Sequence, residues 1–259
     1  MRILNFFGSR VSYTGALDDE VLGMAKKFDS LHVALFFKQG TSFDVEELCK
    51  VATGSPADSL EQQKATGVTT AVLTEDHVQI RFVSGPVRCD IHFFPEAAPG
   101  PEFPPRSIVG GKHIISLAHR VSRRSVEYLG IIQRVGVVVS SVEVFPSPAA
   151  ALVALKKALP FEFGAPPASE DVVVQYNVRR ISGAPEKNAV ELNQLYNKSV
   201  GVAQRFEITE GAAKVERYSV LREALDINTT DVGHELSGPK LVEVINVLFN
   251  HMSSQMVID

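Results

Sequence analysis

One pair of residues in this chain, Asp90 and His92, has the types and the spacing for acid–base chemistry. They lie two positions apart in an alternating segment, so on a β-strand their side chains share a face. A carboxylate and an imidazole on one face could pass a proton to and from a substrate. The same face could instead be solvated and carry cross-strand ion pairs, and this is the interpretation we prefer. Three basic residues should share it: His77, Arg81 and Arg88.

The face depends on a predicted hairpin. Residues 77–83 and 87–94 each alternate apolar and polar side chains, which is typical of an antiparallel pair with one wet face. Between them, Gly85 can supply a positive φ and Pro86 fixes the next φ, so we predict a two-residue type II′ turn. That register places Arg81 opposite Asp90.

A second group of candidate residues lies on a predicted helix over residues 112–127. Its outer side is basic and could bind a phosphate group or an acidic partner, although a solvated helix face is the plainer interpretation. The two histidines of this segment, His113 and His119, are six positions apart, so they do not form the i, i+4 pair that holds a metal on a helix. The candidate binding residues here are His113, Arg120, Arg123 and Arg124.

No catalytic signature accompanies these groups. The sequence contains no GxSxG, HExxH or CxxC motif, and Gly110-Gly111-Lys112 lacks the spacing of a phosphate-binding loop. Cys49 and Cys89 fall on apolar faces, which is typical of buried thiols in a reducing compartment. We therefore assign no catalytic residue, no metal ligand and no cofactor, and we expect a cytoplasmic location.

The composition is that of an ordinary globular protein. The 259 residues are 45% hydrophobic and 22% charged, enough to build a core without a disulfide or a metal. A formal net charge of −4 makes nucleic acid an improbable partner, because nucleic-acid binders usually carry a basic surplus. The chain has no secretory leader pattern and no apolar run of membrane-spanning length, so we expect no membrane contact.

Residues 129–159 form the centre of the expected fold. The β-branched run over residues 135–139 predicts a strand buried on both faces. Ser147 and Pro148 are good residues to begin the helix that follows. Before this centre we predict a helix at 18–28, a strand at 30–38, a helix at 43–53, a polar loop at 54–67, a strand at 66–74 and a loop at 95–111. After it we predict strands at 172–181, 189–200, 202–209 and 214–228, and a helix at 239–256.

The last helix carries a clear apolar stripe: Leu241, Val244, Ile245, Leu248 and Met252. Spacings of three and four residues place these side chains on one side of an α-helix. We expect the stripe to pack on strands 172–178 and 202–208, over Val172, Val174, Tyr176, Val178, Phe206 and Ile208.

The order of these elements repeats. Residues 1–127 and 128–259 each read as strand, helix, several strands and a long helix. We expect these two halves to pack closely, and they could form one continuous domain. We therefore expect an α+β fold with antiparallel sheets, helices on one face, and a tandem pseudo-duplication of a βαβββ(β)α unit. This order resembles the half-repeat of the TATA-binding-protein fold and also helix-grip folds. A resemblance at the level of the fold implies no function.

These observations favour a non-enzymatic protein-interaction protein, such as an adaptor, inhibitor or assembly component, that acts through sheet faces or edges. It could also act as a homodimer. One alternative is an enzyme or small-ligand binder with its site between a curved sheet and a helix, near Asp90 and His92. Another is a binder of nucleic acid or another anion through the basic helix at 112–124.

Overall fold

A computed structural model describes residues 26–38, 43–96, 111–166, 169–182, 190–209, 212–230 and 235–255. In its first half the elements are β1 (Lys27–Phe36), α1 (Val45–Thr53), β2 (Ser59–Gln63), β3 (Val68–Glu75), β4 (Val78–Ser84), β5 (Arg88–Pro95) and α2 (Gly111–Leu129). In the second half they are β6 (Ile131–Ile132), β7 (Arg134–Phe145), α3 (Pro148–Ala158), β8 (Val172–Ser182), β9 (Val190–Thr209), β10 (Ala212–Thr229), β11 (Leu236–Ser237) and α4 (Gly238–Gln255).

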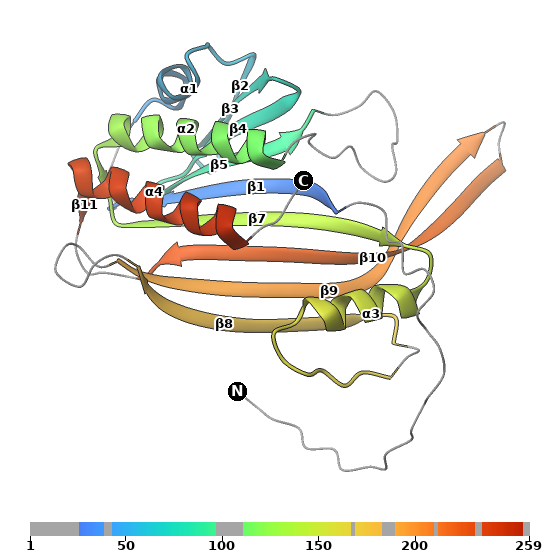
Figure 1. Ribbon diagram of the computed structural model, residues 1–259. Helices are drawn as coiled ribbons and strands as arrows, with labels where there is room; N and C mark the ends of the chain where they lie inside the picture. The colour runs from blue at the N-terminus through green and yellow to red at the C-terminus, as the bar shows by residue number, and fades with distance from the viewer. Residues whose placement is uncertain are drawn as a thin grey trace.

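Nine strands form one antiparallel sheet in the order β2-β3-β4-β5-β1-β7-β10-β9-β8 (Figure 1). Within this sheet, the first strand of each half, β1 and β7, lies near the centre, and each has the last sheet strand of its own half, β5 or β10, on its other side. The short strands β6 and β11 pair separately. The fold is therefore α+β with an antiparallel sheet, as predicted. The strand order agrees with a duplicated unit, and the duplication and the domain division remain predictions.

Local sequence explains where the helices begin. Asp44 precedes α1, and its carboxylate accepts hydrogen bonds from the backbone N–H groups of Glu46 and Glu47. Ser147 does the same for Ala150 at the start of α3, where Pro148 occupies the first turn. Both helices thus satisfy backbone donors that would otherwise lack partners.

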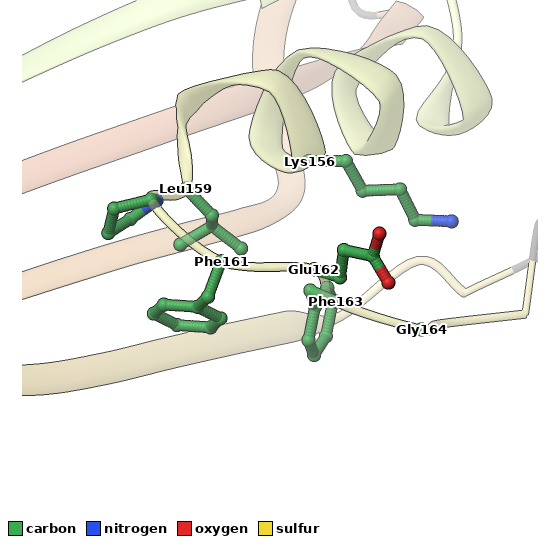
Figure 2. Close-up of a pocket in the computed structure, with 7 residues that line it drawn as sticks. Lys156, Leu159, Phe161, Glu162, Phe163 and Gly164 are labelled. Carbon is green, nitrogen blue, oxygen red and sulfur yellow. The ribbon is translucent and has the colours of Figure 1, made fainter.

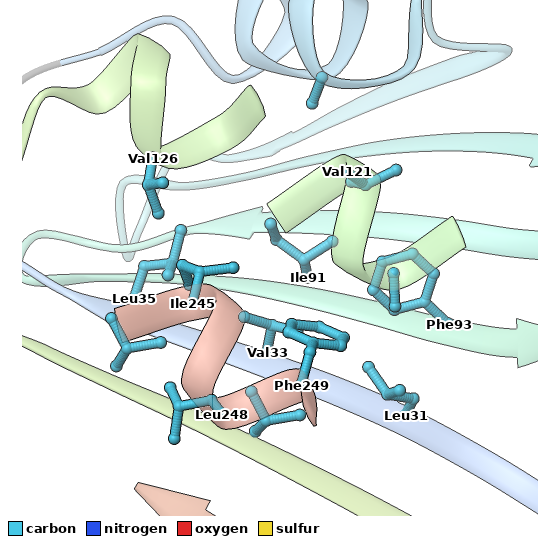
Figure 3. Close-up of a cluster of buried hydrophobic side chains, with 14 of the residues drawn as sticks. Leu31, Val33, Leu35, Ile91, Phe93, Val121, Val126, Ile245, Leu248 and Phe249 are labelled. Carbon is cyan, nitrogen blue, oxygen red and sulfur yellow. The ribbon is translucent and has the colours of Figure 1, made fainter. Parts of the chain in front are cut away.

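The helices cover one face of the sheet, and we call this the covered face. Its main core joins α1, α2 and α4 to alternate residues of the central strands, among them Leu31, Val33 and Leu35 of β1 (Figure 3). A second core lies under α3 and contains Phe145, Leu155 and Leu221. Leu221 and Leu225 of β10 have the same parity and belong to different cores, so both cores lie on the same face.

The apolar stripe of α4 is buried as predicted, but its position was predicted wrongly. Leu241, Val244, Ile245, Leu248 and Met252 are all buried in the core shared with α2 and the central strands. Val172 and Val174 lie instead under α3. The predicted strand at 202–208 is the distal part of β9, beyond the region where β9 pairs with β8. The helix lies at the centre because β1 and β7 pair there, which the order of elements along the chain does not show.

The hairpin of β4 and β5 is antiparallel as predicted, but its register differs. Ser84 pairs with Cys89, the Gly85 N–H donates to the Arg88 carbonyl, and Gly85 has no positive φ. The central turn residues are Pro86 and Val87, since proline suits the first central position of a turn. Arg81 therefore lies opposite His92 and not Asp90. A shift of two residues leaves every side chain on its predicted face.

Three other local predictions need correction. Lys27 and Phe28 belong to β1, so the predicted helix at 18–28 is wrong there, and residues 18–25 lie outside the described part of the chain. Residues 59–63 form the edge strand β2, which pairs with β3, and not a loop. The predicted strands 189–200 and 202–209 are one continuous strand, β9. In each case pairing with a neighbouring strand overrides a weak local preference.

No helix in the described part of the chain is long and apolar enough to cross a membrane.

Candidate functional site

The candidate site lies on the face of the sheet opposite the helices, which we call the open face. Among the described residues, none of the four helices packs on this face near β4, β5, β1 and β7. Alternate residues of these strands place polar and aromatic side chains there. We call this group the open-face cluster: His32, Phe36, Arg81, Arg88, Asp90, His92, Phe94 and Arg134.

Asp90 is the electrostatic centre of the open-face cluster. One of its carboxylate oxygens, Oδ1, lies 2.6 Å from His32 Nε2 and 2.6 Å from Arg88 Nε. Burial acts to raise the pKa of Asp90, but the hydrogen bonds from His32 and Arg88 outweigh it, so this pKa lies below its usual value. Asp90 is therefore ionised at neutral pH and holds both basic side chains in place.

The two histidines of the cluster stack on each other. His32 and His92 are cross-strand partners, and their ring centroids lie 4.3 Å apart with the planes 9° from parallel. His92 also stacks on Phe94, at 5.6 Å. Burial, followed by the charge of His32, lowers the pKa of His92 to about 4. The His92 ring is thus neutral at neutral pH and forms the middle of an aromatic row.

Arginine side chains lie against the phenylalanine rings of the cluster. Phe36 is the cross-strand partner of both Arg88 and Arg134, whose guanidinium carbons lie 5.1 and 5.4 Å from its ring centroid. Arg81 lies 5.8 Å from the ring of Phe94. These distances are within the range of cation–π attraction. Three guanidinium groups are therefore held on rings next to the Asp90 group.

A metal ion is one ligand to weigh here. Among the described residues, His32, Asp90 and His92 are the one group whose potential ligand atoms lie within 4.8 Å of one another. However, a metal binds an imidazole in the plane of its ring, and two nearly parallel stacked rings do not direct their nitrogens to a common point. The Arg88 guanidinium also occupies the same Asp90 oxygen. The geometry suits a charged pairing network better than a metal centre.

The predicted acid–base pair is not assembled as a proton-transfer couple. Asp90 hydrogen-bonds His32 and Arg88, whereas His92 stacks on rings and has a depressed pKa. His77 lies away from the cluster in the turn between β3 and β4, where its 92% exposed side chain contacts Glu96. The open-face cluster therefore contains four predicted residues, Arg81, Arg88, Asp90 and His92, but not His77.

The basic residues of α2 do not join this cluster, because α2 lies on the covered face. Each of three has an acidic neighbour: His113 with Asp76, Arg120 with Glu75, and Arg123 with Glu127. The fourth, Arg124, lies near Gly54 at the end of α1. These ion pairs reduce the net positive charge that α2 presents to an anion.

Two surface pockets lie on the helix side and carry little chemistry. One, of about 660 Å³, is lined by residues 156–164 where the chain leaves α3, and Figure 2 shows Phe161, Phe163, Lys156 and Glu162 around it. The other, of about 510 Å³, lies between α2 and α4 and includes Arg123 and Asn246. The first is formed by a single short stretch of the chain, Lys156 and residues 159–164, so we regard it as a local hollow of the fold.

Four residues of the cluster were not predicted: His32, Phe36, Phe94 and Arg134. His32 stands in the apolar run 30–38, where an isolated polar residue is a weak signal that one face is not packed in a core. Phe36, Phe94 and Arg134 had no such signal. Their grouping depends on β1 pairing with both β5 and β7.

A comparison of the whole chain with protein-family models finds no match, and a search of the curated proteins finds none either.

Proposed function

We propose that this is a non-enzymatic binding protein that holds an acidic segment of a partner protein on its open face. The observation that carries the proposal is the arrangement of Arg88 and Arg134 around Phe36, with Arg81 on Phe94 beside them. Guanidinium groups on rings are oriented before a partner arrives, so a carboxylate-rich segment could bind them with little further ordering. Asp90 neutralises only part of this charge.

Surface anatomy also supports a protein partner. Aromatic and arginine side chains are enriched at protein interfaces and at their energetic hot spots. The cluster is local, on a chain whose net charge is −4, so the partner would be recognised by this surface and not by the overall charge. The homodimer expected from the sequence also remains a prediction.

The two alternatives have less support. An enzyme using Asp90 and His92 would need a hydrogen-bonded couple, and these two groups contact other residues. A nucleic-acid or anion site on α2 would need unpaired cations, whereas Arg120 and Arg123 lie beside carboxylates.

Peptide binding tests the proposal directly. The affinity of a fluorescently labelled glutamate-rich peptide should fall at least tenfold in the Arg88→Ala/Arg134→Ala variant, measured by anisotropy at low salt. Arg123→Ala is the matched control, because it removes an exposed arginine from α2 and should leave the affinity unchanged. The affinity should also decrease as salt increases.

Two outcomes would contradict the proposal. Equal affinity of the double variant and the wild type would place the binding elsewhere. Tight binding of a labelled single-stranded oligonucleotide, with none of the acidic peptide, would favour the nucleic-acid alternative.

A further inference from the structure

The two edges of the sheet differ in how well they are protected from pairing with another strand. β2 at one edge has five residues and contains Glu61, and short length and charge both discourage pairing. β8 at the other edge has eleven residues and no proline, and its two charged residues, Arg179 and Arg180, are adjacent near one end. Two of its β-branched side chains are largely exposed, Val173 at 68% and Ile181 at 75%. An edge of this length is a template for another strand.

The open-face residues of β8 are self-complementary about Asn177. In an antiparallel pair of two β8 strands centred on this residue, Val173 lies opposite Ile181 of the second copy. In the same register, Gln175 lies opposite Arg179 of the second copy, so an amide oxygen meets a guanidinium. All five residues have the same parity, and the structure exposes every one of them. On the open face each apolar residue thus meets an apolar one and each polar residue a polar one, whereas on the covered face Val174 would lie opposite Arg180.

We infer that two copies of this chain associate through β8, antiparallel about a two-fold axis at Asn177. The same residues serve both partners, which is the geometry of an isologous dimer. Backbone hydrogen bonds along the edge would join two nine-stranded sheets into one, as in strand addition. The open faces of both copies would then be continuous, with one open-face cluster in each. This inference does not depend on what the cluster binds.

Disulfide trapping tests the register. With Asn177→Cys, the two new residues would face each other across the axis with Cα atoms about 4.5–5.5 Å apart, within the range that a disulfide spans. Val173→Cys is the control, because its two copies would lie about 27 Å apart, eight residues along the strand pair. The native Cys49 and Cys89 are buried and should not react.

Under mild oxidation at micromolar concentration, we expect Asn177→Cys to form a covalent dimer and Val173→Cys to remain monomeric. Equal cross-linking of the two variants, or none in either, would overturn the inference.

Charges introduced at the two exposed apolar positions provide an independent measurement. In Val173→Lys/Ile181→Lys, each lysine faces a lysine of the second copy, so sedimentation should show a shift from dimer to monomer. In Val173→Lys/Ile181→Glu, each lysine faces a glutamate, so the dimer should persist. Circular dichroism would establish that both variants are folded. A wild-type protein that sediments as a monomer at tens of micromolar, or two double variants with the same behaviour, would contradict the proposed interface.

Discussion

Two carboxylates in this protein are each held between two basic groups, one on each face of the sheet. Glu223 of β10 lies on the covered face and pairs with Lys26 and Lys198, and Lys198 is its cross-strand partner. Asp90 of β5 lies on the open face and bonds His32 and Arg88. Both have a lowered pKa, because the basic partners outweigh the effect of burial. The local chemistry of the two groups is thus similar.

Their surroundings differ. Glu223 is only 9% exposed and lies between the core under α4 and the core under α3. Its two lysines compensate its charge at this position between the two cores. Asp90 is flanked by aromatic rings and guanidinium groups on a face that none of the described helices covers. The Glu223 group is thus part of the packed interior, whereas under the proposed function the Asp90 group belongs to a recognition surface. Three measurements can sharpen or break this contrast.

Packing on the covered face should give the largest effect. Leu248→Ala removes a fully buried side chain from the core that α4 shares with β1, and should cost about 2–5 kcal/mol of unfolding free energy. Glu243→Ala, on the outer side of α4, should change it by less than about 0.5 kcal/mol. Urea denaturation measures both. Equal midpoints would mean that α4 does not pack on the sheet.

The two carboxylates should differ next. Glu223→Ala removes the carboxylate that Lys26 and Lys198 share. We expect the unfolding free energy to fall by about 1–3 kcal/mol, which is the cost of leaving a buried charged group unsatisfied. Asp90→Ala should cost about 1 kcal/mol or less, since Arg88 can turn towards solvent. Asp90→Ala also removes a negative charge beside the arginines, so weaker binding of the acidic peptide would show that the loss of Arg88 orientation outweighs the gain in positive charge. If Asp90→Ala were the more destabilising change, the assignment of roles would be reversed.

The smallest effect should be a pH dependence on the open face. The pKa of His92 is lowered from 6.5 to about 4, so between these values the unfolded chain binds a proton that the folded chain does not. Stability from this group therefore falls as the pH decreases through that window. Asp90 acts in a separate window, because its stabilisation is lost only below its ordinary pKa of 3.8.

His92→Gln should accordingly lose less stability than the wild type between neutral pH and about pH 4.5. Parallel urea titrations at the two pH values measure the difference. His77→Gln is the control, since His77 is exposed and lies outside the cluster. An identical loss in His92→Gln and the wild type would show that His92 is not desolvated.

The sequence by itself determined much of the local structure of this protein, although not every element. Alternation along residues 77–94 predicted β4, β5 and their faces, and the faces survived a wrong register because the shift was two residues. The stripe of Leu241, Leu248 and their neighbours predicted the buried side of α4. Ser147 and Pro148 marked the start of α3. These features follow from the periods of helix and strand and from capping, which act over a few residues.

Only the tertiary structure decided what those elements meet. The pairing of β1 with β5 brings His32 to Asp90 across 58 positions of the sequence. The pairing of β1 with β7 brings Arg134 to Phe36 and places α4 over the centre of the sheet. Strand pairing between distant segments depends on the packing of the whole core, and no local pattern encodes it. For that reason half of the open-face cluster could be predicted from the sequence, and the other half became visible only in the folded chain.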